Sequence, residues 1–249
     1  MILVAGGDSF VWGLELLDCL HSGSNGYSRK TFPALLAQDM EYICAAYPGN
    51  ANNAISRTII TSCESVTEPT VIVNWTFPQR YEFRFNYNTL KETSPWYSIH
   101  PHYPTSDNIR NFDLINDFNV MFYKHVGDNE YYELYSTLKE ILFLQLYLKS
   151  KNIPYLFTTA DNSYYTHQNY LRSKDSCLEA LYNQIIWNNW YWFPPGEETN
   201  ETIAPRGFYQ WAVENKYKVG PEGHPLEEAH QDAAKLIKEK FNAMVKNVN

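Results

Sequence analysis

In the segment MILVAGGDSFVWG (residues 1–13), an apolar run stands directly before a small polar cluster, and this pattern indicates the class of fold. Residues 1–5 are apolar at every position after the initial methionine, which is typical of a central parallel strand covered on both faces. The small, turn-prone cluster GGDS follows at once, so Ser9 lies where a buried strand ends. A serine in this place either caps the next helix or acts as a nucleophile, and the segment by itself supports both interpretations.

The rest of the chain repeats this alternation of strand and helix. Apolar, β-branched segments predict further strands at residues 41–46, 70–75 and 153–160, and helical periodicity predicts helices at residues 31–40, 52–63, 131–152, 170–192 and 225–249. We therefore predict an α/β protein, a three-layer α/β/α sandwich with a mostly parallel, flavodoxin-like sheet. We expect a single domain over residues 1–249, with aromatic-rich insertions at about 78–129 and 160–215, where periodicity is weak.

This topology predicts which segments meet. Right-handed crossovers place every strand-to-helix loop at the carboxyl edge of a parallel sheet. Ser9, Gly49 and Thr76 each follow a predicted strand, so we expect them close together. A glycine lets its backbone N–H approach a ligand, and a threonine hydroxyl can donate a hydrogen bond, so Gly49 and Thr76 are candidate oxyanion donors beside the N–H of Ser9. Each of these residues alone is also an ordinary turn residue.

The C-terminal part of the chain supplies a candidate base. His224 lies in PEGHPLEEAH, just before the last predicted helix, and Glu222 is two residues upstream. A loop of this kind can bring an imidazole to the sheet edge while a carboxylate holds its Nδ1–H. The alternative is that His224 is a loop or capping residue. His230, six residues further on, is expected to be an intrahelical or surface residue.

Composition excludes several other classes of function. The formal net charge is −8 and no basic stripe is present, so nothing favours nucleic-acid binding. The four cysteines are far apart and form no CxxC pair, which argues against a zinc site or a disulfide framework. His100 and His102 have a spacing that could bind a metal, but no carboxylate or cysteine cluster accompanies them, so a loop role is favoured. We predict no metal and no organic cofactor.

The chain shows no secretory or membrane signal. Its first apolar run is four residues long without a basic flank, and no segment approaches the roughly 20 apolar residues that span a bilayer. We expect a soluble cytoplasmic protein without a membrane partner, or one of the host cytoplasm or virion if a phage encodes it.

Four short motifs together resemble the SGNH, or GDSL-type, hydrolases. GDSFVWG is similar to their first block and PGNANNAISR to their second, NWT falls where the third block usually reads Gly-x-Asn-Asp, and EGHPLEEAH resembles the last block, Asp-x-x-His-Pro. Their order and spacing agree from residue 6 to 230. The resemblance implies an α/β/α fold and an ester hydrolase that needs no cofactor. A softer resemblance links the chain to hydrolase-like proteins encoded by bacteriophages.

The resemblance also implies a role for each matching residue. Ser9 would be the nucleophile and first oxyanion donor, Gly49 the second donor, and His224 the general base. The third donor is normally an asparagine, and the matching position here is Thr76. The acid is normally three residues before the histidine, where this chain has Pro221, so Glu222 is the nearest substitute.

Five further residues at the same edge are candidates for binding the substrate. Arg80 could pair with Glu82 or meet an anionic group of the substrate. The others lie in or beside the motifs and complete the set of Asp8, Asn52, Asn74, Trp75 and Arg80.

The sequence thus predicts a serine esterase that cleaves a carboxylic ester of a small molecule or a glycan. The chain has 20 Tyr and 7 Trp residues, concentrated between residues 81 and 217, and such rings stack on sugar faces, so an acylated or acetylated glycan is the candidate substrate. The departures at Thr76 and Glu222 leave an alternative open. In it, the chain is a weak or inactive binding or structural module on the same fold, of the kind a phage particle could use.

Overall fold

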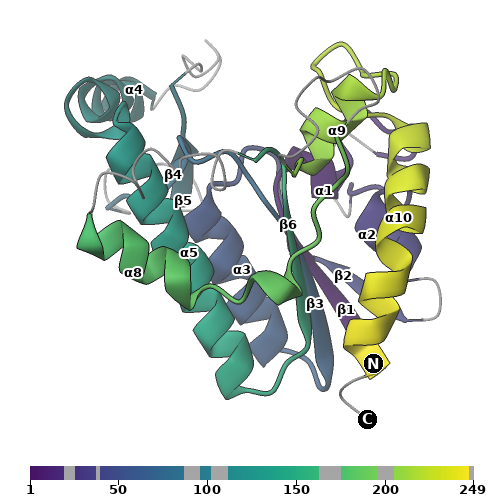
Figure 1. Ribbon diagram of the computed structural model, residues 1–249. Helices are drawn as coiled ribbons and strands as arrows, with labels where there is room; N and C mark the ends of the chain where they lie inside the picture. Colours follow the sequence, from purple (N-terminus) through teal and green to yellow (C-terminus); the bar gives the residue numbers. More distant parts are fainter. Residues whose placement is uncertain are drawn as a thin grey trace.

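A four-stranded parallel sheet lies at the centre of the structure (Figure 1). The structure is a computed structural model that describes residues 1–19, 26–37, 40–86, 96–101, 112–162, 175–195 and 205–246, with only the backbone at residues 112–114. The strand order is β2-β1-β3-β6, and all three neighbouring pairs are parallel. The strands are β1 (Ile2–Gly6), β2 (Glu41–Cys44), β3 (Pro69–Trp75) and β6 (Tyr155–Thr159).

Helices cover both faces of this sheet (Figure 1). One face packs against α3 (Asn52–Glu64), α5 (Glu130–Ser150) and α8 (Ser176–Gln184). The other packs against α1 (Ser9–Trp12), α2 (Phe32–Leu36), α9 (Phe208–Glu214) and α10 (Glu227–Lys246). The predicted three-layer α/β/α sandwich with its flavodoxin-like sheet is therefore confirmed.

The apolar start of the chain is explained by the position of β1. Leu3 and Ala5 face the core beneath α10, whereas Val4 faces the core beneath α3, and all three are fully buried. Gly6 has no room for a side chain, because a Cβ atom there would lie 2.6 Å from the Ile59 side chain of α3. A strand that is buried on both faces has no polar position, which is why its pattern does not alternate.

The long helices α3, α5 and α10 match their predictions, whereas α2 is shorter than predicted. Asn129 caps α5 by accepting a hydrogen bond from the Tyr132 N–H at 3.1 Å. The predicted helix at 31–40 is described only over α2, and Thr31 forms no side-chain cap; Pro33 in the first turn marks the start instead. Leu236 of α10 is 41 % exposed because it lies beside the buried stripe formed by Ala233 and Ile237.

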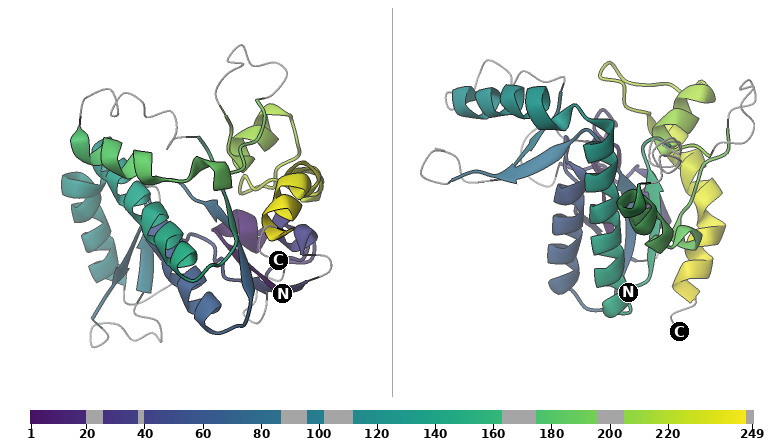
Figure 2. Two further views of the ribbon diagram at one scale, coloured as in Figure 1. Left: turned by 60° about the horizontal axis from the view of Figure 1, so that its bottom comes forward. Right: turned by 60° about the vertical axis from the view of Figure 1, so that its left-hand side comes forward.

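The insertion at 78–129 has structure that its sequence did not predict. It contains the antiparallel strands β4 (Tyr81–Arg84) and β5 (Trp96–Ile99), then α4 (Phe112–Phe122), which continues as the π-helical turn η2 (Tyr123–Gly127). These elements extend away from the main sheet (Figure 2). Their small core forms around Tyr81, Ile99 and Ile115 and is largely aromatic, so no apolar periodicity marked it.

The second insertion also differs from its prediction. The helix expected at 170–192 is described over α8 alone and is followed by a single 3₁₀ turn, η3 (Trp187–Asn189). The seven-residue helix α9 was not predicted at all, since it is too short to show a periodic stripe.

None of the helices in the described ranges combines the length and the apolar run that crossing a membrane requires.

Candidate active site

The turn after β1 presents Ser9 as the first residue of the short helix α1. Asp8, not Ser9, is the cap of this helix, because its Oδ1 accepts the Phe10 N–H at 3.0 Å. Gly13 ends the helix with φ +81°, a conformation that favours glycine, and donates its N–H to the Ser9 carbonyl at 2.9 Å. Ser9 is 6 % exposed, and its own N–H enters no hydrogen bond with any described residue. Its side chain is thus not needed to cap the helix.

The turn after β2 supplies a second free backbone donor. Gly49 has φ +78°, and a Cβ atom there would meet nothing within 4 Å, so the backbone conformation and not lack of space favours glycine. Like that of Ser9, the Gly49 N–H enters no hydrogen bond in the described part of the chain. The neighbouring Asn50 donates from Nδ2 to the Gly7 carbonyl at 3.0 Å, which ties this turn to the one before Ser9.

The carboxylate that contacts His224 is Glu15, not Glu222. Nδ1 of His224 lies 2.7 Å from Oε2 of Glu15, across 209 residues of sequence. Glu222 takes part only through its backbone N–H, which donates to Oε1 of Glu15 at 2.9 Å. The expectation that Glu222 holds the imidazole is therefore wrong. Glu15 has no motif of its own, and no sequence signal could have linked it to a loop so far away.

Glu15 is held as an ionised group. Burial alone would raise the pKa of its carboxyl group, but hydrogen bonds from the Glu222 N–H and from the ring and backbone of His224 outweigh that effect and lower the pKa. The side chains of Glu15 and His224 are 10 % and 12 % exposed. A carboxylate in this position can orient an imidazole and stabilise its protonated form.

The two chain ends converge at one edge of the sheet. The ring of Phe10, the residue after Ser9, contacts the ring of His224 edge-to-face, with centroids 5.6 Å apart. Among the described residues, no hydrogen bond joins Oγ of Ser9 to Nε2 of His224. Catalytic hydrogen bonds are often long in the absence of substrate and shorten in the reacting complex.

Thr76 does not have the free hydroxyl that the sequence suggested. It is fully buried, and its Oγ1 donates its single hydrogen to Oδ2 of Asp8 at 2.6 Å. Nη1 of Arg80 donates to the same Asp8 oxygen at 2.9 Å and to Thr76 Oγ1 at 2.8 Å. A hydroxyl has one hydrogen, so Thr76 in this arrangement cannot also donate to an oxyanion.

Arg80 and Glu82 do not pair with each other. Arg80 forms its ion pair with Asp8, which is fully buried, and its guanidinium lies 5.2 Å from the centroid of the Phe77 ring. Glu82 instead accepts two hydrogen bonds from Arg57 of α3, at 2.6 and 2.9 Å. Arg80 keeps 19 % of its side chain exposed and is the one predicted substrate-binding cation at this edge.

The remaining candidates for substrate binding are buried in the framework. Asn52 holds the third turn, since its Oδ1 accepts the Thr76 N–H at 3.0 Å and its Nδ2 donates to the Thr76 carbonyl and to Thr137. Asn74 and Trp75 are fully buried, and Trp75 packs edge-to-face on Phe157. Their burial leaves none of the three able to contact a substrate from the surface.

The other histidines that the sequence analysis considered are His230 and the pair His100 and His102. His230 is 1 % exposed, and its Nδ1 accepts the Phe32 N–H at 3.1 Å, so it is a core residue and not a surface one. Burial, and secondarily the charge of His224, lowers its pKa to about 3. His102 lies outside the described residues, so the suggested His100–His102 pair is not seen as a whole. Within the described ranges no three His, Cys, Asp or Glu side chains are grouped so as to hold a metal ion.

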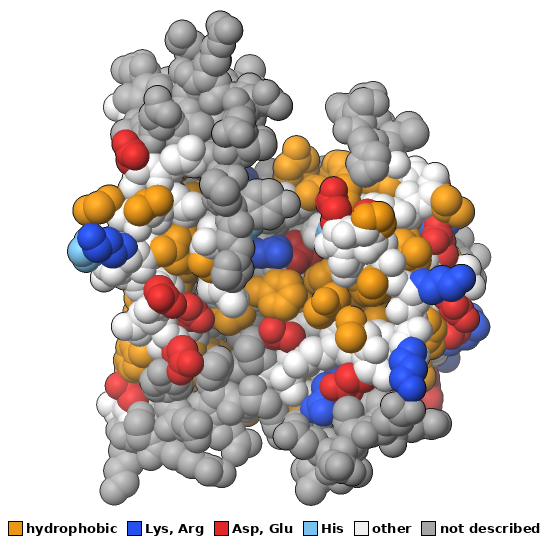
Figure 3. Space-filling model, turned by 90° about the horizontal axis from the view of Figure 1, so that it is seen from above, with side chains coloured by type: hydrophobic (Ala, Val, Ile, Leu, Met, Phe, Trp, Pro, Cys, Tyr) orange, Lys and Arg blue, Asp and Glu red, His pale blue; other side chains and the backbone are white. Residues whose placement is uncertain are grey.

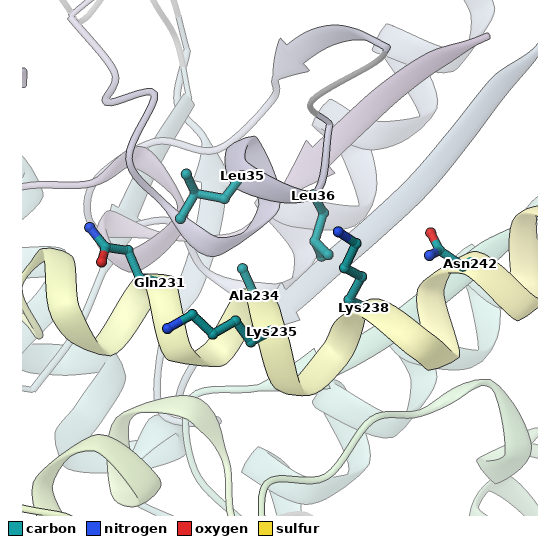
Figure 4. Close-up of a pocket in the computed structure, with 7 residues that line it drawn as sticks. All are labelled: Leu35, Leu36, Gln231, Ala234, Lys235, Lys238 and Asn242. Atoms are coloured by element: carbon teal, nitrogen blue, oxygen red, sulfur yellow. The ribbon is translucent and has the colours of Figure 1, made fainter.

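The face above the carboxyl edge is hollowed (Figure 3). Hydrophobic side chains line the hollow, and a basic side chain lies within it. A separate pocket of about 320 Å³ lies between α2 and α10 (Figure 4). None of the candidate site residues lines that pocket; its lining comes from Leu35, Leu36, Gln231, Ala234, Lys235, Lys238 and Asn242.

Comparison with solved structures finds chains that are similar to this one. No protein-family model matches the chain. No curated protein matches it either. The chain is similar to a structure assigned to the G-D-S-L lipolytic family from Desulfitobacterium hafniense, with a TM-score of 0.48 and 11 % identity over 96 % of this chain and 98 % of that one.

Two further structures have similar values. One is a member of the lipolytic G-D-S-L family from Veillonella parvula, with a TM-score of 0.47 and 12 % identity over 97 % of this chain and 98 % of that one. The other is a carbohydrate esterase of family 2 with a carbohydrate-binding domain from Corynascus thermopiles, with a TM-score of 0.48 and 10 % identity over 98 % of this chain and 66 % of that one. At these identities and TM-scores the function has to be inferred from the side chains of the chain itself.

Proposed function

We propose that the protein is a serine esterase in which Ser9 is the nucleophile and His224 the general base. The observation that carries the proposal is the meeting of two chain ends at one sheet edge. There a serine at a helix N-terminus, two backbone N–H groups that form no hydrogen bond with the described residues, and an imidazole in contact with a carboxylate occupy neighbouring turns. These are the parts that acyl transfer requires.

The reaction would run in two halves. Oγ of Ser9 attacks the ester carbonyl carbon while Nε2 of His224 takes the hydroxyl proton. The N–H groups of Ser9 and Gly49 stabilise the oxyanion, and its collapse breaks the bond to the alcohol, which leaves with the proton from His224. Water, deprotonated by His224, then attacks the acyl-serine, and the carboxylic acid departs as Ser9 regains its proton.

We propose an acylated or acetylated glycan as the substrate class. Phe77 and Tyr209 are partly exposed beside Phe10, and Tyr209 stacks on Phe10 with centroids 5.5 Å apart. Such rings offer apolar faces on which a sugar can lie. Arg80, above the Phe77 ring, would donate hydrogen bonds to hydroxyl or carbonyl oxygens, because its charge is already balanced by Asp8.

A fluorophosphonate probe and p-nitrophenyl acetate test the proposed function. The wild type should be labelled on Ser9 and should hydrolyse the ester. The variants Ser9→Ala and His224→Ala should each lose labelling, and their kcat should fall by about 10³-fold or more. Ser150→Ala, an exposed serine at the end of α5, is the matched control and should match the wild type. Full activity in Ser9→Ala would refute the proposal.

A binding module on the same fold is the second candidate. Two observations favour it: the Thr76 hydroxyl donates its hydrogen to Asp8, so Thr76 does not supply the third oxyanion donor, and Ser9 is not hydrogen-bonded to His224. One missing donor slows an esterase by roughly 10²–10³. A folded wild type that is neither labelled nor active, yet binds an acetylated glycan in calorimetry, would support this candidate over the enzyme.

A further inference from the structure

We propose that Glu15 is the positioning residue that orients His224, so that the carboxylate of this site comes from the turn after α1 and not from the loop that carries the histidine. The proposal rests on the proposed function and deepens it. Glu15 does not touch the reacting atoms; it acts through the imidazole.

Three donors from one loop converge on the Glu15 carboxylate. Oε1 accepts the Glu222 N–H at 2.9 Å, and Oε2 accepts the His224 N–H at 3.2 Å and faces Nδ1 of the His224 ring at 2.7 Å. The carboxylate therefore fixes the loop backbone and the imidazole at the same time. Among the described residues, the side chain of Glu15 alone does this, since Glu222 contributes only its backbone N–H.

The loop is shaped around this carboxylate. A Cβ atom at Gly220 would lie 2.4 Å from Cδ of Glu15 and 2.5–2.6 Å from its two oxygens, so any larger residue there would displace the carboxylate. The Gly220 N–H donates to the His224 carbonyl at 2.8 Å, and the Gly223 N–H donates to the Gly220 carbonyl at 2.9 Å. These bonds close the loop into a cradle with the carboxylate inside it.

The backbone of Glu15 is held in an unusual conformation. Its φ is +70°, in the left-handed region that costs a residue with a side chain about 1–2 kcal/mol. A second contact holds the same turn, because the Leu17 N–H donates to Oε1 of Glu227, in the first turn of α10, at 2.9 Å. Strain that the surroundings maintain is found at functional sites. Here the strained residue is the one whose side chain reaches His224.

This contact determines which nitrogen of His224 is available. A carboxylate beside Nδ1 accepts a hydrogen bond from it, so the neutral ring carries its hydrogen on Nδ1 and leaves the Nε2 lone pair for the Ser9 proton. When Nε2 takes that proton, the negative charge of Glu15 stabilises the imidazolium. The Nδ1 proton stays on the ring throughout. Of the other groups near His224, His230 is buried and neutral, and Phe10 is apolar.

The experiment compares Glu15→Gln with Glu222→Gln, two neighbouring carboxylates of which only one contacts the ring. Glu15→Gln should lower kcat by about 10²–10⁴ with KM little changed, because the orientation of the base and not binding is lost. Glu222→Gln should keep the wild-type kcat. Gly220→Ala keeps Glu15, but the added methyl group should displace its carboxylate, so this variant should also have a lower kcat. Circular dichroism and thermal melting check that each variant is folded.

A second readout does not depend on activity. In proton NMR, the Nδ1–H of His224 should give a low-field signal in the wild type and in Glu222→Gln, and the signal should be lost in Glu15→Gln. A kcat in folded Glu15→Gln equal to that of the wild type would overturn the proposal, as would a loss confined to Glu222→Gln. Failure of the proposed function is distinct, since it appears as wild type that the probe does not label or as active Ser9→Ala.

Discussion

Asp8 and Glu15 are two carboxylates on either side of the same short helix, and the structure uses them differently. Asp8 is fully buried, and both its oxygens accept hydrogen bonds from Phe10, Thr76 and Arg80. Glu15 also accepts several hydrogen bonds, but one of its partners is a histidine ring whose second nitrogen enters none with the described residues. Asp8 thus hydrogen-bonds only with groups that hold the framework together among the described residues. Glu15 instead contacts the His224 ring, whose Nε2 can still accept a proton.

The comparison shows that the partners of a carboxylate decide its role. The network around Asp8 fixes the first and third turns together and uses up the Thr76 hydroxyl that the sequence suggested as an oxyanion donor. The network around Glu15 fixes the first turn and the last loop together but leaves Nε2 of His224 available. We therefore expect changes at Asp8 to affect mainly stability and changes at Glu15 to affect mainly catalysis.

The largest expected effect on stability is that of Asp8→Asn. The change leaves the Arg80 guanidinium without its counter-charge in a largely buried position, which should lower the free energy of unfolding by about 3–5 kcal/mol. Urea unfolding measures the loss. The double variant Asp8→Asn, Arg80→Met should regain part of it, because no unpaired charge remains. If Asp8→Asn unfolds at the wild-type midpoint, the network around Asp8 does not stabilise the fold.

Thr76→Val should have the next largest effect. It removes the donor to Asp8 and the acceptor for Arg80 while keeping the shape of the side chain, so the free energy of unfolding should fall by about 1–3 kcal/mol. Thr76→Ser keeps the hydroxyl and is the control. Because the hydroxyl is not free for an oxyanion, kcat should fall by less than the roughly 10²–10³ that a lost oxyanion donor costs. A larger fall in folded Thr76→Val would show that Thr76 turns toward the substrate.

A smaller effect should separate two replacements of Glu15. Both Glu15→Ala and Glu15→Gly remove the carboxylate, but only glycine adopts φ +70° without strain. Glu15→Gly should therefore be more stable than Glu15→Ala by about 1 kcal/mol, after the greater freedom of glycine in the unfolded chain is subtracted. Thermal melting compares the two. Equal stabilities would mean that the turn relaxes once the carboxylate is gone.

The smallest expected effect is a pH dependence that Glu15 contributes. Its pKa in the folded protein is lowered below the ordinary value, so its contribution to stability is complete above the unfolded pKa of about 4.3 and is lost as the pH falls through the folded pKa. Glu15→Gln lacks this contribution. The difference in unfolding free energy between wild type and Glu15→Gln should thus shrink as the pH falls from about 5 into the acid range. A difference independent of pH over that range would contradict an ionised Glu15.

Much of the fold could be read from local patterns. The all-apolar segments at residues 2–5 and 70–75 predicted strands buried on both faces, and the stripes of α5 and α10 predicted their helices, because burial on a regular element imposes a period on the sequence. The strands of the first insertion and α9 escaped prediction because they are short, and the core of that insertion is largely aromatic and shows no apolar periodicity.

Local signals at strand ends and helix starts were enough to predict that Ser9 follows a buried strand, that Gly49 occupies a turn and that His224 precedes the last helix. Which side chains touch one another follows from the three-dimensional packing. Glu15 meets His224 across 209 residues, and Arg80 meets Asp8 across 72. Side-chain pairing over such separations depends on how the turns are placed at the sheet edge, and that placement follows from the packing of the whole domain and not from any one segment.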